Sequence, residues 1–371
     1  MKMPNEKGQV EYAKERLVKA VNQVLGVVRR NGRSRKVGLA LVLMVLLGGR
    51  ASVRNAAETF GLDYANLLEA LGELHDAWRD YLEVLSELVK GEVAVIIDDT
   101  VDHKEYSRGK NVSPHGNYWI YCHAHRRFER GVQLLTVAIV DLSTGRAFMV
   151  GAFPYAVRKM LDLGMVTEFK TKIDLAKEIL DVLKGYFRVS RVVFDSWYWS
   201  EKLVKDNVVS ELKSNRRLLR VESVRGTLEE VEGHLRVGDL PPGVYYADLT
   251  LRDRVITVKL LVQEYKGDSG THVRYLYTTD LSLSEEEIEE AWRMRWEIEK
   301  LHRDVKALGL EDSSFWRRER LQGYLTIFTI MINVVRELIG ALNLRSVEAF
   351  LRFVERYLGG SSGLMKIFKL R

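Results

Sequence analysis

The chain has 371 residues, of which 46% are hydrophobic, enough for two or three structural units with an apolar core. Its one cysteine, Cys122, excludes an internal disulfide, argues against a structural zinc site built on thiolates, and fits a reducing cytoplasm. The longest apolar run, Leu39 to Leu47, is too short to cross a bilayer, so we expect a soluble protein without a membrane partner.

The net charge of +6 is concentrated in the first 36 residues, which hold ten Lys and Arg against three Glu. Within this basic arm, the segment "RRNGRSRK" (Arg29 to Lys36) carries five positive charges in eight residues, a pattern suited to phosphate backbones. A solvated linker would show the same pattern, so charge alone leaves both interpretations open.

The first 90 residues predict a helical N-terminal region. After two helices, Ala57, Gly61 and Leu67 stand where a helix-turn-helix needs a small residue, a turn glycine and a buried aliphatic. The second helix of this unit, Asp63 to Leu74, contains three acidic residues and neither Lys nor Arg. A structural helical bundle is therefore as good an interpretation as base reading.

From residue 91 the periodicity becomes that of strands. The predicted strands are Val93 to Thr100, Val132 to Leu142 and Arg146 to Tyr155, rich in β-branched and aromatic residues. A helix over residues 172–187 then leads to the buried strand "SRVVFDS", which contains Asp195. This alternation indicates an α/β sheet layered with helices over residues 91–213.

The remaining chain divides into three segments. Residues 214–282 read as a mostly β insertion. Ser284, with Glu287 three residues later, forms a capping-box start for one long helix within a second core segment, residues 283–342. Residues 343–371 hold a C-terminal helix and a tail that the segment "GGSSG" loosens.

Two predicted strands end in aspartates. Because successive side chains of a strand point to opposite faces, Asp98 and Asp99 cannot easily serve the same site. Asp195 follows "VVF" at a strand end, where α/β sheets place their ligands. An aspartate at such a position often only caps a turn, so either strand end is informative mainly in combination with a third carboxylate.

That third carboxylate lies on the long helix. A rotation of about 100° per residue places Trp292, Arg295, Glu299 and Lys306 within a stripe of about 60°. A carboxylate between two cations indicates a site for an anionic substrate and a metal. Carboxylates from two strands and a helix suit Mg²⁺ or Mn²⁺, and two such ions support in-line phosphoryl displacement. The two cations would then hold phosphates.

At these residues the sequence resembles the DDE transposases of prokaryotic insertion sequences, in the branch with a Tyr-x2-Arg-x3-Glu-x6-Lys helix signature. The spacing Trp292-x2-Arg295-x3-Glu299-x6-Lys306 matches it, with Trp292 in place of the tyrosine and therefore without its hydroxyl. The segments "IIDDT" and "VVFDS" resemble the other two catalytic blocks in the right order, so the likeness spans residues 93 to about 340.

The resemblance implies a ribonuclease-H-like mixed sheet flanked by helices, an α-helical N-terminal domain for DNA binding or dimerisation, and a β-rich insertion that contacts transposon-end DNA. It implies cut-and-paste cleavage and strand transfer of double-stranded DNA with two Mg²⁺ or Mn²⁺ ions and no covalent protein–DNA intermediate. The expected partners are terminal inverted repeats, target DNA and a second copy of the chain, in the nucleoid-associated cytoplasm of a prokaryote.

The resemblance also assigns site residues. It implies that Asp99, Asp195 and Glu299 are the catalytic residues and metal ligands, with Asp99 favoured over Asp98 because a threonine directly follows it. It assigns DNA contacts to Trp292, Arg295 and Lys306.

Two alternative functions share parts of this pattern. Another ribonuclease-H-like nuclease, such as a junction resolvase, would have the same carboxylates, but the long insertion and the Arg/Glu/Lys helix argue against it. A catalytically inactive or domesticated DNA-binding protein descended from a transposase would not need all three carboxylates intact.

Three further segments each have two interpretations. "YCHAH" sets His123 and His125 two apart as a metal pair, or as core or DNA-facing residues, and a third ligand nearby in sequence is lacking. The basic segment His103 to Trp119 either tracks DNA or is solvated. "SWYWS" (Ser196 to Ser200) either stacks bases beside Asp195 or packs in the core.

Overall fold

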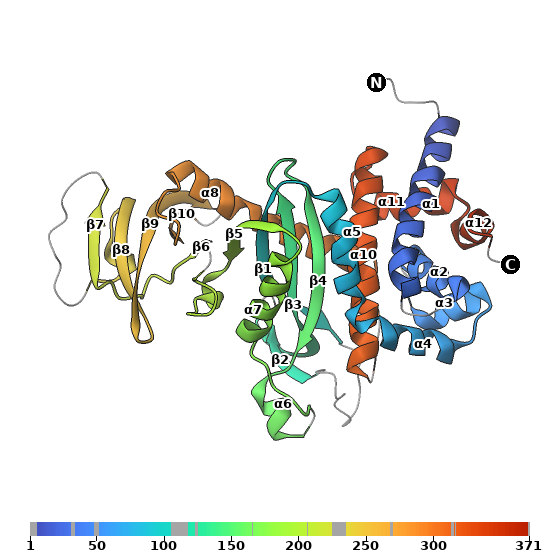
Figure 1. Ribbon diagram of the computed structural model, residues 1–371, viewed down its shortest axis with the longest axis horizontal. Helices are drawn as coiled ribbons and strands as arrows, with labels where there is room; N and C mark the ends of the chain where they lie inside the picture. Colours follow the sequence, from blue (N-terminus) through green and yellow to red (C-terminus); the bar gives the residue numbers. More distant parts are fainter. Residues whose placement is uncertain are drawn as a thin grey trace.

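The structure is a computed structural model that describes residues 6–30, 34–47, 52–104, 118–122, 125–164, 166–205, 207–224, 235–267, 270–312, 315 and 317–369. Along the longest axis, Figure 1 shows a helical bundle at one end, a sheet in the middle and a β extension at the other end. The N-terminal helices and the last two helices lie together at the bundle end.

The N-terminal region is helical, as predicted. It contains α1 (Glu6–Arg30), α2 (Arg35–Met44), α3 (Val53–Phe60), α4 (Tyr64–Glu73), η1 (Leu74–Asp76) and α5 (Ala77–Leu88). The side chains of Ser34, Ser52 and Asp63 accept hydrogen bonds from backbone N–H groups at the starts of α2, α3 and α4. Residues 31–33 of the basic arm lie outside the described residues.

The predicted helix-turn-helix segment forms two helices that meet at a left-handed glycine. Gly61 ends α3 with φ of 59°, and Ala57 and Leu67 are buried between the helices. One side of α4 packs against a later core helix, whereas Asp63 and Glu69 are exposed. The local geometry therefore follows the sequence pattern, and base reading stays a prediction.

The strands join in one mixed sheet. They are β1 (Glu92–His103), β2 (Tyr118–Cys122), β3 (Arg127–Asp141), β4 (Ala147–Tyr155), β5 (Arg188–Phe194), β6 (Val208–Glu211), β7 (Arg220–Ser223), β8 (Gly243–Leu251), β9 (Arg254–Gly267) and β10 (Gly270–Thr278). Their order is β2-β3-β1-β5-β6-β10-β9-β8-β7, and β4 also pairs with β3. β1 runs antiparallel to β3 and parallel to β5, which in turn runs parallel to β6. This arrangement is consistent with a ribonuclease-H-like fold.

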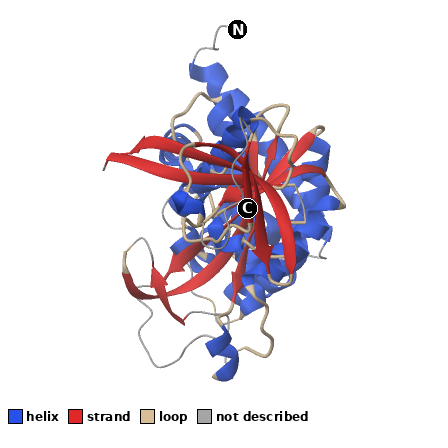
Figure 2. Cartoon of the chain, turned by 90° about the vertical axis from the view of Figure 1, so that its left-hand side faces the viewer, coloured by secondary structure: helices blue, strands red, loops and turns tan. Residues whose placement is uncertain are grey.

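The β-rich segment continues the core sheet. β10 pairs with β6, with Thr278 opposite Val209, and β9, β8 and β7 follow outward from it. Figure 2, viewed from the end that carries this β extension, shows the twist of the molecule's strands. The segment predicted as an insertion is thus hydrogen-bonded to the strands that precede it in the core.

Helices cover both faces of this sheet. The remaining helices are α6 (Arg158–Asp162), α7 (Lys172–Lys184), η2 (Ser196–Tyr198), η3 (Val237–Asp239), α8 (Glu285–Met294), α9 (Trp296–Ala307), η4 (Leu310–Asp312), α10 (Arg318–Ala341), α11 (Val347–Tyr357) and α12 (Gly360–Ile367). α7 contacts β3 and β5, whereas α8 contacts β5, β6 and β10 and α9 contacts β1, β3 and β4.

The central helix α10 joins the sheet to the N-terminal bundle. It has the length and hydropathy of a membrane span, but 72% of its apolar window is buried inside the protein, as in the core helix of a soluble protein. Its buried Asn333 bonds both the backbone N–H and the carbonyl of Met149 in β4, and also the hydroxyl of Tyr81 in α5. One amide side chain therefore ties three elements together.

The C-terminal tail differs from its prediction. The segment "GGSSG", expected to be loose, forms the start of α12, where Leu364 and Phe368 are buried. Gly359 adopts a left-handed φ of 77°, and a Cβ on Gly363 would stand only 1.6 Å from the carbonyl oxygen of Leu358. These glycines permit a tight turn between packed helices, which is why their presence did not loosen the chain.

Candidate active site

The two adjacent aspartates of β1 lie in different surroundings, as the alternation of a strand predicts. In the pairing with β3, Asp98 lies opposite Thr136 and Asp99 opposite Leu135. Asp98 Oδ2 lies 3.6 Å from Nη1 of Arg295, which precedes α9. The α9 face of the sheet is therefore the face that carries Asp98.

Asp99 points to the other face, toward α7. Its Oδ1 accepts hydrogen bonds from Lys172 Nζ at 2.7 Å and from the Tyr198 hydroxyl at 3.1 Å. Its Oδ2 accepts a longer bond from the Tyr155 hydroxyl, at 3.4 Å. Asp99 is thus held by an ammonium group and two tyrosines. Sequence reasoning assigned none of the three to Asp99, although Tyr198 lies in the segment "SWYWS".

Asp195 stands one residue beyond the end of β5, beside Asp98. In the parallel pairing of β1 and β5, Phe194 lies opposite Ile97, and Asp195 keeps an extended backbone with φ −81° and ψ 174°. The register therefore brings Asp195 level with Asp98, and the charges of Lys172, Asp99 and Arg295 all act on Asp195. Its Oδ1 also accepts a hydrogen bond from the N–H of Trp197 at 2.9 Å, so this carboxylate caps η2 as well.

The helix expected to run unbroken through Glu299 divides at Arg295. The N–H of Arg295 donates to the carbonyl of Trp292, and the N–H of Ile298 donates to the carbonyl of Arg295, both to the third preceding residue. This local tightening separates α8 from α9 although Arg295 keeps helical angles, φ −55° and ψ −33°. The capping box of Ser284 and Glu287 at the start of α8 is present as predicted.

Arg295 connects the strand carboxylate to the helix carboxylate. Its Nη2 lies 2.7 Å from Glu299 Oε1, while Nη1 faces Asp98. The guanidinium lies over the rings of Trp292 and Trp296, at 5.1 and 5.3 Å from their centroids. The structure therefore gathers Asp98 and Glu299 around one cation.

The other two residues expected at the DNA also contact protein groups. The Trp292 ring is buried, with 5% of the residue exposed. Lys306 Nζ pairs with Glu311 Oε1 at 2.9 Å and donates to the carbonyl of Val101 at 3.0 Å. Of the predicted stripe, Glu299 is the most open member, with 37% of its side chain exposed.

Burial and mutual repulsion raise the pKa values of Asp98 and Asp195. Burial raises the pKa of Asp98 to about 7, and the charges of Asp195 and Asp99 add to that rise. Burial also raises the pKa of Asp195, again with a contribution from Asp99. A bound cation would relieve this crowding of negative charge, and carboxylate oxygens are the ligands that Mg²⁺ and Mn²⁺ prefer.

His302 is a buried residue of α9 that sequence reasoning missed. Its Nε2 lies 2.7 Å from Thr136 Oγ1, and that hydroxyl donates its proton to the carbonyl of Asp98. His302 Nε2–H is therefore the donor toward Thr136. Burial lowers the pKa of His302 to about 4, so the ring is neutral at pH 7. This chain of bonds holds α9 against β1 and β3.

The aromatic segment after Asp195 divides between both of its interpretations. Tyr198 is fully buried, whereas 59% of Trp197 is exposed. The Nζ atoms of Lys172 and Lys213 lie 5.2 and 4.5 Å from the centre of the Trp197 ring. Trp197 thus presents an aromatic surface with two cations beside the carboxylates. Most of the basic segment 103–119, and His123, fall in parts of the chain that the structure does not describe.

A comparison with protein families identifies a match over most of the chain. The family described as archaeal putative transposase ISC1217 matches residues 5–347, a range that includes every residue of the candidate active site. None of the curated proteins matches this chain.

Proposed function

We propose that this chain, which belongs to the archaeal putative transposase family ISC1217, cleaves the ends of an insertion sequence and transfers the strands to target DNA. The observation that carries the proposal is the meeting of Asp98 and Glu299 at Arg295, with Asp195 directly after the neighbouring parallel strand and level with Asp98. Buried carboxylates with raised pKa values at a strand end are typical of a site that acts on a ligand.

Within this proposal we assign the first carboxylate to Asp98. The sequence favoured Asp99 because of the threonine after it, but Asp99 is turned toward α7 and bonded to Lys172. Asp98 faces Arg295, which also pairs with Glu299, and Asp195 lies level with Asp98 after the neighbouring strand. The proposed set is therefore Asp98, Asp195 and Glu299, and Asp99 would fix Lys172 near the site.

These three carboxylates fit divalent cations. Their donors are hard oxygens from two strands and a helix, the set that suits Mg²⁺ or Mn²⁺, and two ions would supply activation of the attacking oxygen and stabilisation of the leaving oxygen. Asp98, Asp195 and Glu299 would hold the ions. Arg295, which pairs with both Asp98 and Glu299, would orient the Glu299 carboxylate.

The substrate in this proposal is double-stranded DNA. Lys306 and Arg295 would contact phosphates. The buried ring of Trp292 would hold the Arg295 guanidinium in place by packing against it. Exposed Trp197, with two lysines over its ring, suits a base that stacks beside Asp195. We also propose that the chain acts as a homodimer that holds two terminal repeats, in the cytoplasm of a prokaryote.

Neighbouring carboxylates of β1 provide a matched pair for the test. Asp98→Asn, Asp195→Asn and Glu299→Gln should each abolish Mg²⁺-dependent cleavage of a duplex that carries the DNA flanking the gene, with binding in a gel-shift assay retained. Asp99→Asn should cleave within several-fold of the unchanged chain, provided that its melting curve shows it folded.

The cleavage results distinguish a wrong choice of the first carboxylate from a wrong proposed chemistry. Loss of cleavage in Asp99→Asn together with full cleavage in Asp98→Asn would reverse the assignment of the first carboxylate and leave the transposase intact. Full cleavage by all four variants would remove the proposed chemistry from this site.

A further inference from the structure

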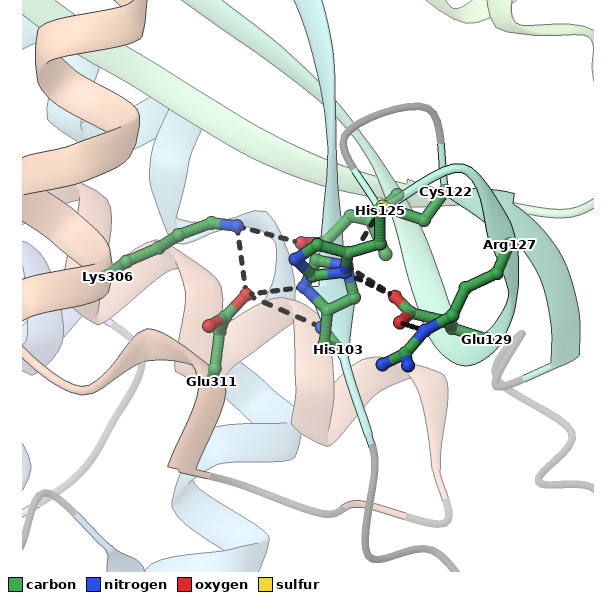
Figure 3. Close-up of polar contacts among 8 residues, drawn as sticks. His103, Cys122, His125, Arg127, Glu129, Lys306 and Glu311 are labelled. Atoms are coloured by element: carbon green, nitrogen blue, oxygen red, sulfur yellow. Dashed lines mark hydrogen bonds and ion pairs between the residues drawn. The ribbon is translucent and has the colours of Figure 1, made fainter.

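A second group of metal-binding side chains lies at the far end of β1. It consists of His103 at the end of β1, Cys122 at the end of β2, His125 in the following turn and Glu129 in β3. One ligand atom from each lies within 4.8 Å of the other three. Figure 3 shows the four side chains directed toward one another.

Strand pairing brings these distant residues together. His103 lies opposite Gly131 in the pairing of β1 with β3, and Cys122 lies opposite Arg127 in the pairing of β2 with β3. A Cβ on Gly131 would stand 2.7 Å from the carbonyl oxygen of Asp102, so glycine permits the close approach of the two strands. The end of β1 and the β2–β3 hairpin therefore converge on one point.

We propose that His103 Nε2, Cys122 Sγ, His125 Nδ1 and Glu129 Oε2 bind one structural Zn²⁺ ion. Neighbouring ligand atoms of a tetrahedral zinc site lie roughly 3.3–3.6 Å apart, given Zn–N near 2.0–2.1 Å and Zn–S near 2.3 Å. His103 Nε2 lies 3.4 Å from Cys122 Sγ and 3.3 Å from Glu129 Oε2, within this range. His125 Nδ1, now 2.8 Å from Glu129 Oε2, would move apart by about half an ångström to become a ligand.

The donor set selects zinc over the ions of the carboxylate site. A thiolate and two imidazoles are borderline-soft donors that favour Zn²⁺, whereas Mg²⁺ takes oxygen. Four protein ligands complete a tetrahedron and leave no position open, which is the form of a structural site. The sequence-based argument against zinc assumed several thiolates, and this site needs only Cys122.

Neighbouring residues form hydrogen bonds with these ligands, as the residues that orient metal ligands do in zinc sites. His103 Nδ1 lies 3.3 Å from Glu311 Oε1, and a ring that donates Nδ1–H to a carboxylate keeps the Nε2 lone pair for a metal. Arg127 Nε donates to Oε1 of Glu129, which leaves Oε2 directed at the group.

Ion pairing alone explains less of this arrangement. Glu129 would gain from His125 and Arg127 without any metal. Such pairing gives no reason for the buried thiol of Cys122 to meet the same ring nitrogen of His103 that faces Glu129. A shared metal ion accounts for all of these contacts.

The zinc site would connect to the signature helix through one carboxylate. Glu311 Oε1 faces both His103 Nδ1 and Lys306 Nζ, so fixing His103 also fixes Glu311 beside Lys306. The ion would therefore position Lys306 as well as lock the β2–β3 hairpin to β1. The inference concerns metal binding and stands whether or not the chain cleaves DNA.

The test uses the full chain, stripped with a chelator and reloaded with Zn²⁺ in excess Mg²⁺. We expect one zinc per chain by elemental analysis after gel filtration, and slower modification of the thiol by a disulfide reagent when zinc is present. Loading with Co²⁺ should give a thiolate-to-metal charge-transfer band. This band can arise only from Cys122, since the chain has no other cysteine.

Variants separate this site from the carboxylate site. Cys122→Ser and His103→Ala should lose the bound zinc, and Glu311→Gln should bind it about 10–100-fold more weakly. His125→Ala should also lose the bound zinc. His75→Ala is its matched control, because the His75 and His125 side chains are 45% and 46% exposed, and the His75→Ala variant should retain zinc. The combined variant Asp98→Asn, Asp195→Asn, Glu299→Gln should also retain it.

Three results would overturn the site: no zinc after reloading, zinc retained at full occupancy in Cys122→Ser and His103→Ala, or no thiolate band with Co²⁺. If the single-residue variants fail to fold, the Co²⁺ spectrum and the thiol protection of the unchanged chain decide the question.

Discussion

Acid should loosen the helix of Glu299 through His302. This ring is buried, and its Nε2–H donates to Thr136, whose hydroxyl in turn bonds the carbonyl of Asp98. Burial lowers its pKa from 6.5 to about 4. As the pH falls, the unfolded chain therefore takes up this proton first. Stability from His302 is complete above about pH 6.5 and is lost as the pH falls toward 4.

The size of the effect follows from the two pKa values. A difference of one pKa unit corresponds to about 1.4 kcal/mol, so the full loss is about 3 kcal/mol, and about 2 kcal/mol of it falls between pH 7 and pH 5. His302→Gln keeps an amide donor near Thr136 but has no group that titrates in this range. Its free energy of unfolding should drop by about 2 kcal/mol less than that of the unchanged chain over the same interval.

Urea denaturation followed by tryptophan fluorescence at pH 7 and pH 5, in the presence of a chelator, measures this difference. Other titrating groups contribute equally to both proteins and cancel in the comparison. Equal losses in His302→Gln and the unchanged chain would show that protonation of His302 does not set the acid sensitivity.

Two further predictions concern α10 and use the same denaturation assay. Gly323→Ala would place a Cβ 1.8 Å from the carbonyl oxygen of Leu71, so α4 must move away, and we expect a loss of about 2–3 kcal/mol. Gly340→Ala, in the same helix with nothing within 4 Å, should be neutral or stabilising, and an equal loss there would refute the steric argument. Asn333→Ala leaves the N–H and carbonyl of Met149 without their partner and should cost about 2 kcal/mol or more; a neutral result would mean that water replaces the amide.

Local signals in the sequence predicted much of the fold. The C-terminal helix predicted within residues 343–371 is present as α11 (Val347–Tyr357), and the capping box of Ser284 is present. The helix-turn-helix pattern predicted a turn glycine at Gly61, which has a left-handed backbone conformation in the structure. These features depend on hydrogen bonds and packing within a few residues, which is why a sequence window contains enough information to predict them.

The candidate site depended on long-range contacts that no window contains. Alternation showed that Asp98 and Asp99 point apart, but only the position of Arg295 shows which of them faces the helix. In the same way, "YCHAH" lacked a third ligand nearby, while strand pairing supplies His103 from 19 residues before Cys122. The register of a sheet decided both cases.

The pairing of β10 with β6 has a mechanical consequence. β6 also pairs with β5, the strand that leads to Asp195, so an unbroken ladder of hydrogen bonds connects β7 to the carboxylates. In the proposed function, DNA bound by the outer strands would therefore be held at a fixed distance from the active-site carboxylates, because no flexible linker separates these strands from the core sheet.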